Sequence, residues 1–386
     1  MDRQTKVLDR IRGGMIGGAA GDALGYTIEF CTEDEIFGKY GQLGITEYEL
    51  TDGKALISDD TQMSLFTANG LLVEQTRYDM RGISAMPRVY VNMAYQNWLQ
   101  TQFTDGYDNR DHEWTGETRV SWLLDVPELY AHRAPGNTCI QGLIKRSQED
   151  YPEDYIKAPI NHSKGCGGIM RVAPVAFMYG NGYENGGDKI DIEAAQIAAI
   201  THSHPLGYMP AAVLSHIIGR IIAADGAESL KDSVIKARDA VERIFAGTEH
   251  LQELTNIIDL AVTLSENADS DLDNIHKLGE GWVAEETLAI AIYCSLRYQH
   301  DFSKAIITAV NHKGDSDSTG AVTGNIVGVI AGYSGIDEKW KNNLELADVI
   351  LEMAEDMGSG CQISEYSDKQ DLAWESKYIY MRRAEK

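Results

Sequence analysis

The sequence has few cysteines, and none of them are closely spaced. Five thiols are scattered over 386 residues, at Cys31, Cys139, Cys166, Cys294 and Cys361. A disulfide framework needs an even set of paired cysteines, and a structural zinc site needs ligands at short, matched spacing. The pattern argues against both and suits a reducing compartment, so we expect a cytoplasmic protein with free thiols.

The sequence also has no uninterrupted run of about 18 apolar residues, the length needed to cross a membrane. The first 25 residues carry several charges, including Asp22, so we do not expect them to act as a signal peptide. Basic residues are outnumbered by acidic ones, 34 to 59, which gives a formal net charge of −25. Such a surface repels polyanions, so we expect no binding to nucleic-acid backbones. Because no long apolar run is present, we expect no membrane-spanning segment.

Alternating apolar and polar residues, the pattern of half-buried strands, are rare, and helical periodicity dominates. We therefore predict an all-α fold. A single domain is expected over residues 1–386, with an irregular acidic and aromatic tail from about residue 360, because no linker separates the helices. Helices are predicted over 5–24, 61–75, 84–100, 117–130, 137–147, 191–203, 208–224, 229–245, 249–267, 284–297, 302–311, 318–332 and 339–356.

Two of the predicted helices have unusual composition. The segment 208–224 is apolar almost all round, which predicts a central helix surrounded by others. The first helix contains six glycines, each of which costs about 1 kcal/mol relative to alanine in a helix. Glycine permits a close approach of a neighbouring helix or of a ligand, and we expect helix packing to explain most of these positions.

Two clusters of Asp and Ser or Thr each stand at the start of a predicted helix. One is ISDDTQMS at 57–64, and the other is GDSDSTG at 314–320. One interpretation is ordinary helix capping, in which side-chain oxygens accept from free backbone N–H groups. The other is a divalent-cation site, because clustered carboxylate and hydroxyl oxygens are the ligands that Mg²⁺ and Mn²⁺ take. Spacing alone leaves both interpretations open.

Five segments resemble motifs of the ADP-ribosylglycohydrolase family, in the family's order. They are GGMIGGAAGDALGYTIEF (13–30), ISDDTQMS (57–64), NHSKGCGGIMRVAPV (161–175), ITHSHPLGY (200–208) and GDSDSTGAVTGNIVG (314–328). The resemblance implies a single large orthogonal multi-helix bundle with a two-metal cleft. It also implies a Mg²⁺-dependent hydrolase, with Mn²⁺ as the alternative ion, that cleaves the bond between ADP-ribose and an acceptor.

The resemblance also implies individual site residues. Two ions would be held by Ser58, Asp59, Asp60, Asp315, Asp317 and Ser318, with Asp317 bridging them. Glu29 and Asp60 would be the catalytic carboxylates, although a solvated loop position is the common fate of a glutamate. The glycine loop with Gly165, Gly167 and Gly168, together with His202, would contact ADP-ribose. Asn137 would line the same cleft, or it or Thr138 would simply cap a helix.

Other functions fit the same oxygen ligands. A two-metal phosphohydrolase acting on nucleotide-like substrates could use them, and so could a non-catalytic ADP-ribose-binding or immunity protein. The acceptor would be an ADP-ribosylated protein or small molecule. An arginine or guanidine acceptor is our first expectation and serine the second. The loops 31–56 and 101–116, which would contact the acceptor, carry no signature that identifies it. The sequence does not indicate an oligomeric state.

Overall fold

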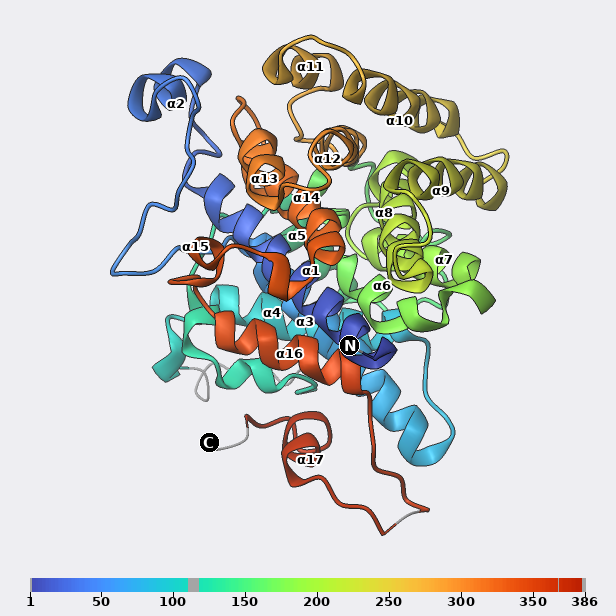
Figure 1. Cartoon of the computed structure of the whole chain (residues 1–386). Helices are drawn as coiled ribbons and strands as arrows, with labels where there is room; N and C mark the ends of the chain where they lie inside the picture. The colour runs from blue at the N-terminus through green and yellow to red at the C-terminus, as the bar shows by residue number, and fades with distance from the viewer. Residues whose placement is uncertain (1, 110–117, 367, 384–386) are drawn as a thin grey trace.

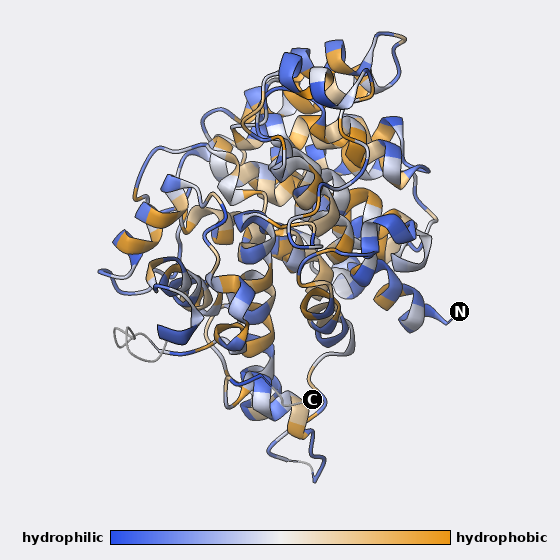
Figure 2. Ribbon diagram, turned by 90° about the vertical axis from the view of Figure 1, so that its left-hand side faces the viewer, coloured by the Kyte–Doolittle hydropathy of each residue, from blue (hydrophilic) through white to orange (hydrophobic). Residues whose placement is uncertain are grey.

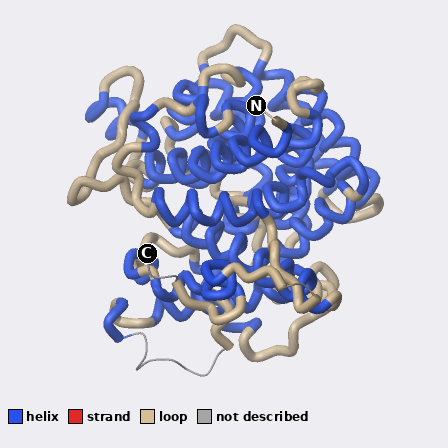
Figure 3. The backbone as a smooth tube through the Cα atoms, turned by 60° about the horizontal axis from the view of Figure 1, so that its bottom comes forward, coloured by secondary structure: helices blue, strands red, loops and turns tan. Residues whose placement is uncertain are grey.

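The computed structural model describes residues 2–109, 118–366 and 368–383. Within these ranges it contains 17 α-helices, six short 3-10 helices and three isolated β-bridges, and no strand (Figures 1 and 3). The prediction of an all-α fold is confirmed. Residues 110–116 of the loop 101–116 lie outside the described ranges.

The α-helices have the following bounds: α1 (Arg3–Tyr26), α2 (Glu33–Tyr40), α3 (Asp59–Arg81), α4 (Pro87–Phe103), α5 (Asn137–Arg146), α6 (Ala173–Tyr179), α7 (Gly187–Ala199), α8 (Pro205–Ala224), α9 (Leu230–Ile244), α10 (Leu251–Ser265), α11 (Asp271–Leu278), α12 (Ala284–Arg297), α13 (Phe302–Val310), α14 (Ser316–Ala331), α15 (Glu338–Lys341), α16 (Ala347–Ser359) and α17 (Leu372–Tyr378).

The helices α1 and α14 lie side by side at the centre of the molecule (Figure 1). Their glycines meet in antiparallel order: Gly13 with Gly328, Gly17 with Gly324, and Gly21 with Gly320. A Cβ atom on any of these residues would overlap the backbone of the other helix, so only glycine permits this approach. The prediction that the glycines of the first helix serve packing is confirmed.

The helix α8 is the most apolar long helix of the described residues. It is long and apolar enough to cross a membrane by length and composition alone, but 89% of its apolar window is buried inside the protein. Figure 2 shows that many helices combine apolar and polar residues, as expected for helices that bury one face. The predicted central position of α8 is confirmed by this burial.

Some predicted helices are wrong. The segment predicted as one helix over 117–130 forms two 3-10 helices, Trp122–Asp125 and Pro127–Tyr130, because Pro127 lacks the N–H that a continuing helix would need. The segment 339–356 is divided into α15 and α16, and Asn343 and Leu346 between them have positive φ angles. Four short helices, α2, α6, α11 and α17, are not predicted, because segments of 7 or 8 residues show too little periodicity.

The segment after residue 360 is not wholly irregular, contrary to the prediction, because it contains α17. Trp374 and Tyr378 of α17 are buried. The indole Nε1 of Trp374 donates to Thr76 Oγ1 of α3 at 3.0 Å, and Lys377 forms an ion pair with Asp356 of α16. These two aromatic side chains of the segment therefore pack on the same chain.

Candidate metal centre

The two acidic segments meet at one cavity. Asp59 and Asp60 are the first two residues of α3, Asp315 is the N-cap of α14, and Asp317 lies in the first turn of α14. All four side chains are buried. They line the same cavity of about 220 Å³, together with Ser318. The folding of the chain therefore brings together two segments that lie about 250 positions apart in the sequence.

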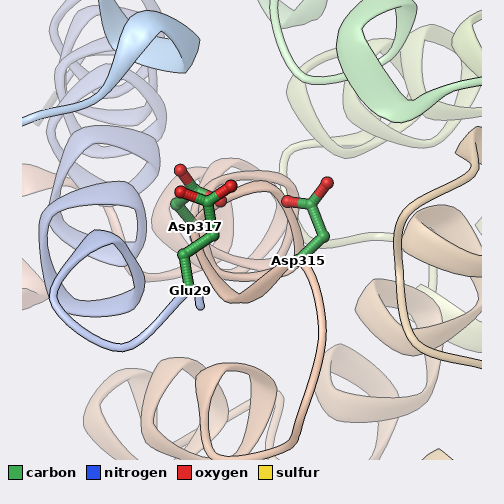
Figure 4. A group of neighbouring side chains, drawn as sticks. All are labelled: Glu29, Asp315 and Asp317. Carbon is green, nitrogen blue, oxygen red and sulfur yellow. The ribbon is translucent and has the colours of Figure 1, made fainter. Parts of the chain in front are cut away.

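Glu29 completes the group of carboxylates. It lies in the turn that follows α1, and one oxygen each of Glu29, Asp315 and Asp317 lies within 4.8 Å of the other two (Figure 4). The Glu29 carboxylate therefore lies close enough to Asp315 and Asp317 to bind the same metal ion. The interpretation of Glu29 as a solvated glutamate is wrong, because its side chain is buried.

Burial and mutual repulsion make these carboxyl groups weak acids in the absence of a cation. Burial, followed by the negative charges of Asp315 and Asp59, raises the pKa of Glu29 to about 8. Burial likewise raises the pKa of Asp59 to about 8. The pKa of Asp60 lies well above its usual value because of burial and the charges of Asp22 and Asp59.

Two oxygens of the cavity have no hydrogen-bond partner among the described residues. They are Glu29 Oε2 and Asp60 Oδ2, and both belong to side chains that are more than nine-tenths buried. A buried carboxylate oxygen without a partner is costly, and a divalent cation would satisfy it. The predicted metal ligands offer only carboxylate and hydroxyl oxygens, which fits a hard cation such as Mg²⁺.

Capping and metal binding do not exclude each other at these helix starts. The Oδ1 atom of Asp315 accepts from the backbone N–H of Ser318 at 3.2 Å, while its Oδ2 atom accepts from the Cys166 thiol at 2.7 Å. The hydroxyl of Ser58 accepts from the N–H of Asp60 at 3.2 Å. The capping interpretation is therefore correct for Ser58 and Asp315. Capping uses only the Oδ1 atom of Asp315, so it leaves the Oδ2 atom for another partner.

The six predicted metal ligands are not placed alike. Five of them line the cavity, whereas Ser58 does not and is fully buried. The role of Ser58 as a ligand stays a prediction. Its backbone N–H donates to both carboxylate oxygens of Asp22, at 2.9 and 3.1 Å.

Asp22 is a structural residue of the site that the sequence analysis did not identify. Its carboxylate is fully buried and accepts from the N–H groups of Ser58 and Thr61, and from the Thr61 hydroxyl. Burial raises its pKa to about 6 against these hydrogen bonds. Asp22 therefore ties α1 to the first turn of α3. A single carboxylate in the glycine-rich apolar part of α1, residues 13–25, is the signal that could have revealed it.

The glycine loop lies directly over His202. Gly165 and Gly167 line the cavity, and a Cβ atom on Gly167 would overlap the His202 ring. Gly168 does not line the cavity. A Cβ atom there would overlap the carbonyl oxygen of Gly207, so glycine is needed at this position for packing. The contact of Gly168 with ADP-ribose stays a prediction.

His202 is buried and lines the cavity, and its Nδ1 lies 2.8 Å from Thr201 Oγ1. Burial and the nearby Arg171 charge lower the pKa of His202 to about 3, so the ring is neutral at physiological pH. A neutral imidazole ring has one N–H donor and one acceptor nitrogen, so it can donate to a phosphate oxygen or bind a sugar hydroxyl.

Asn137 lines the cavity and also an adjoining one. The residue that caps α5 is Gly136, without a side-chain hydrogen bond, so the interpretation of Asn137 or Thr138 as a cap is wrong. The Gly136 N–H donates to Asp59 Oδ2 at 3.3 Å, which links the start of α5 to the carboxylates.

The chain is similar to known proteins over almost its whole length. The family model for ADP-ribosylglycohydrolase matches residues 3–367. The ADP-ribosyl-[dinitrogen reductase] glycohydrolase of Rhodospirillum rubrum is 24% identical over 349 residues, which cover 88% of this chain and 92% of that protein. The ADP-ribosylarginine hydrolase Tri1 of Serratia proteamaculans is 23% identical, covering 92% of this chain and 80% of that protein.

Two further similarities are more limited in what they show. The human ADP-ribosylhydrolase ARH3 is 24% identical over 208 residues, which cover 47% of this chain and 54% of that protein. A solved structure titled "ADP-ribosylglycohydrolase-related protein complex" superposes with a TM-score of 0.62 at 21% identity, covering 92% of this chain and 99% of the other. This second similarity establishes the fold.

Proposed function

The chain belongs to the ADP-ribosylglycohydrolase family, and on that premise we propose that this enzyme is a Mg²⁺- or Mn²⁺-dependent hydrolase. It would cleave the glycosidic bond between ADP-ribose and an arginine-type or protein acceptor. Two relatives that cover most of the chain are named for ADP-ribosylated dinitrogen reductase and for ADP-ribosylarginine, which supports this acceptor class.

One observation carries the proposal. Carboxylates from the turn after α1, the start of α3 and the start of α14 meet at one buried cavity, and two of their oxygens have no hydrogen-bond partner among the described residues. Such an arrangement is costly for the apo protein, because like charges are held together out of water. A bound divalent cation offsets this cost, and Asp59, Asp60, Asp315, Asp317 and Ser318 would hold it, with two ions as the proposed number.

The chemistry divides between the cation and the carboxylates. The bound cation supplies Lewis acidity that orients a ribose and lowers the pKa of water. Glu29 and Asp60 are the proposed catalytic carboxylates, and either would accept a proton from an attacking water through an oxygen that does not hold the cation. Hydrolysis of a glycosidic bond passes through a cation-like sugar, which buried carboxylates stabilise.

The remaining cavity walls suit the rest of ADP-ribose. We propose that the backbone of Gly165 and Gly167, which both line the cavity, lies against the diphosphate, because the N–H groups of a glycine loop suit an anion. His202 and Asn137 would bind sugar oxygens from either side. We also propose that residues 1–386 act as one domain and that the protein is cytoplasmic, in keeping with its five free cysteines.

The test is product analysis with a panel of substrates. The purified protein is incubated with Mg²⁺ and with ADP-ribosylated arginine, guanidine or serine compounds, and free ADP-ribose is measured. We expect ADP-ribose from at least one acceptor, loss of activity in EDTA, and recovery on addition of Mg²⁺ or Mn²⁺. Glu29→Gln removes a proposed proton acceptor and should lower kcat by about 10²–10⁴-fold.

Two other results would replace this proposal. Release of phosphate or AMP instead of ADP-ribose would identify a two-metal phosphohydrolase. Tight binding of ADP-ribose without turnover, unchanged by metal removal, would identify a non-catalytic binding protein.

A further inference from the structure

Two aromatic side chains lie exposed beside the carboxylate cavity. Trp282 lines that cavity and is 40% exposed, and Phe30, which follows Glu29, is 73% exposed. Their rings stack with centroids 6.1 Å apart and planes at 24°. Large aromatic side chains that stay in water at the mouth of a cavity mark a surface that a ligand covers.

The segment that carries Trp282 is fixed on both sides. The carbonyl of Trp282 accepts from the N–H of Cys166 in the glycine loop at 3.2 Å. The carbonyl of Glu280 accepts from the N–H of Asp315 at the start of α14, at 2.9 Å. The backbone that carries the indole is therefore tied to both the glycine loop and the segment with the carboxylates.

Two larger cavities adjoin the carboxylate cavity at different residues. A cavity of about 510 Å³ shares Asn137 and Thr138 with it, and its wall includes Lys145 but no carboxylate. A cavity of about 660 Å³ shares Trp282 with it. The charged and titratable side chains of that second cavity are Glu33, His276, Glu280, Glu286 and Lys313.

The second cavity has an excess of negative charge. Lys313 pairs with Glu280 at 2.8 Å, and His276 lies 2.6 Å from Glu33. The carboxylate of Glu286 accepts from the backbone N–H groups of Glu280 and Gly281, and no ion pair of Glu286 is found in the described part of the chain. A diphosphate would be repelled from this side, and a cation would be attracted.

The substrate of the proposed reaction has an anionic diphosphate at one end and the acceptor at the other. The two larger cavities differ in the same way, because one has a lysine and no carboxylate and the other has an excess of carboxylates. The lysine side suits the ADP part, and the acidic, aromatic side suits a cationic acceptor. A guanidinium is planar and positively charged, and it stacks on aromatic faces. We propose that Trp282, with Phe30, forms the acceptor site and selects a guanidinium, as in ADP-ribosylated arginine. This inference rests on the hydrolase function proposed above.

The test compares two acceptors in wild type and variants. Kinetic constants are measured for ADP-ribosyl-arginine and for O-linked ADP-ribosyl-serine with Trp282→Ala, Trp282→Tyr and Phe103→Ala. Phe103 is a matched control, since it is 64% exposed at the end of α4 and lines none of the three cavities. Trp282→Ala should raise KM for the arginine substrate about 3- to 30-fold, the range of a lost cation–π contact.

The same experiment has a binding readout. Agmatine, a free guanidine, is titrated by calorimetry into protein loaded with ADP-ribose, and its affinity should fall in Trp282→Ala by the same factor. Trp282→Tyr keeps a ring and should stay near wild type, and so should Phe103→Ala. In Trp282→Ala the rise in KM should be larger for the arginine substrate than for the serine substrate, and larger than any loss of affinity for ADP-ribose alone.

Contrary results separate the two proposals. If the serine substrate is cleaved and the arginine substrate is not, the hydrolase function stands and the guanidinium site is overturned. If Trp282→Ala weakens ADP-ribose itself and affects both acceptors equally, the indole holds the adenine, and the inference is again overturned. If no acceptor releases ADP-ribose in the presence of metal, the hydrolase function itself fails.

Discussion

Gly17 of α1 and Gly324 of α14 face each other so closely that a Cβ atom on either residue would overlap the carbonyl oxygen of the other. The same reciprocal contact joins Gly21 to Gly320. Because α1 leads into Glu29 and α14 begins at the aspartates, the distance between these helices sets the distance between the carboxylates. The glycines therefore serve the site as well as the core.

Gly21→Ala should strongly destabilise the protein. The added methyl group meets backbone atoms of Gly320 and Ala321 that cannot rotate away, and overpacking of this kind costs at least about 1–3 kcal/mol. Urea unfolding in EDTA measures the free energy of unfolding. The control is Gly38→Ala in α2, where nothing lies within 4 Å of the added Cβ, and a gain of about 0.5–1 kcal/mol is expected. Equal effects of the two substitutions would contradict the packing explanation.

Asp22→Ala should weaken metal binding without removing a proposed ligand. The substitution leaves the backbone N–H groups of Ser58 and Thr61 without their buried acceptor, which costs about 1–3 kcal/mol for each unsatisfied group. The start of α3 then loses its fixed position, and loss of such a supporting contact typically lowers metal affinity 10–100-fold. Calorimetry with Mn²⁺ checks the affinity. Asp2→Ala removes an exposed cap of α1 and should leave it unchanged.

The metal-free protein should lose stability as the pH rises. The folded state raises the pKa of Asp59 and Glu29 to about 8, above the values of about 4 in the unfolded chain. Between these values the folded state binds more protons than the unfolded chain, so the contribution of these groups to the free energy of unfolding falls from about pH 4 to 8. Urea titrations in EDTA at pH 5 and pH 8 measure this change, and a site that is more stable at pH 8 would contradict it.

Asp60→Asn separates the cost of the carboxylates from their use. In EDTA at pH 8 the variant should be more stable than wild type, since it removes one buried charge from a repelling group. In excess Mg²⁺ the order should reverse, because the variant loses the stabilisation that the bound cation gives to wild type. Thermal unfolding in both buffers checks the reversal. If Mg²⁺ stabilises the variant as much as it stabilises the wild type, Asp60 is not a ligand of the cation.

Trp374→Ala should release the segment after residue 360 while leaving the metal site intact. The substitution removes a buried indole and its hydrogen bond to Thr76, a change that typically costs about 3–5 kcal/mol. Limited proteolysis with mass spectrometry should show cleavage within 360–383 ahead of any other site. The control Leu372→Ala lies on the same helix, but its side chain is 75% exposed, and it should resist like wild type.

The helical fold and most long helices could be predicted from the sequence, because their periodicity extends over two turns or more. The pair of acidic segments could also be identified, since each is a compact run of residues with one chemistry. The roles of Asp22 and Gly168 could not. Asp22 acts through contacts with residues more than 30 positions away, and Gly168 has the same local pattern as Gly165 and Gly167.

Composition and local order thus determined the class of fold, the family resemblance and the types of oxygen ligand, because these depend on residue type and near neighbours. Only the tertiary structure decided which carboxylate oxygens have no hydrogen-bond partner among the described residues and which glycines of the loop line the cavity. It also decided that Trp282 stacks on Phe30 beside the acidic cavity. Those facts depend on the crossing of α1 with α14 and on the contact of residues 280–284 with the glycine loop. Contacts of this kind between distant segments leave no periodic trace in a single sequence.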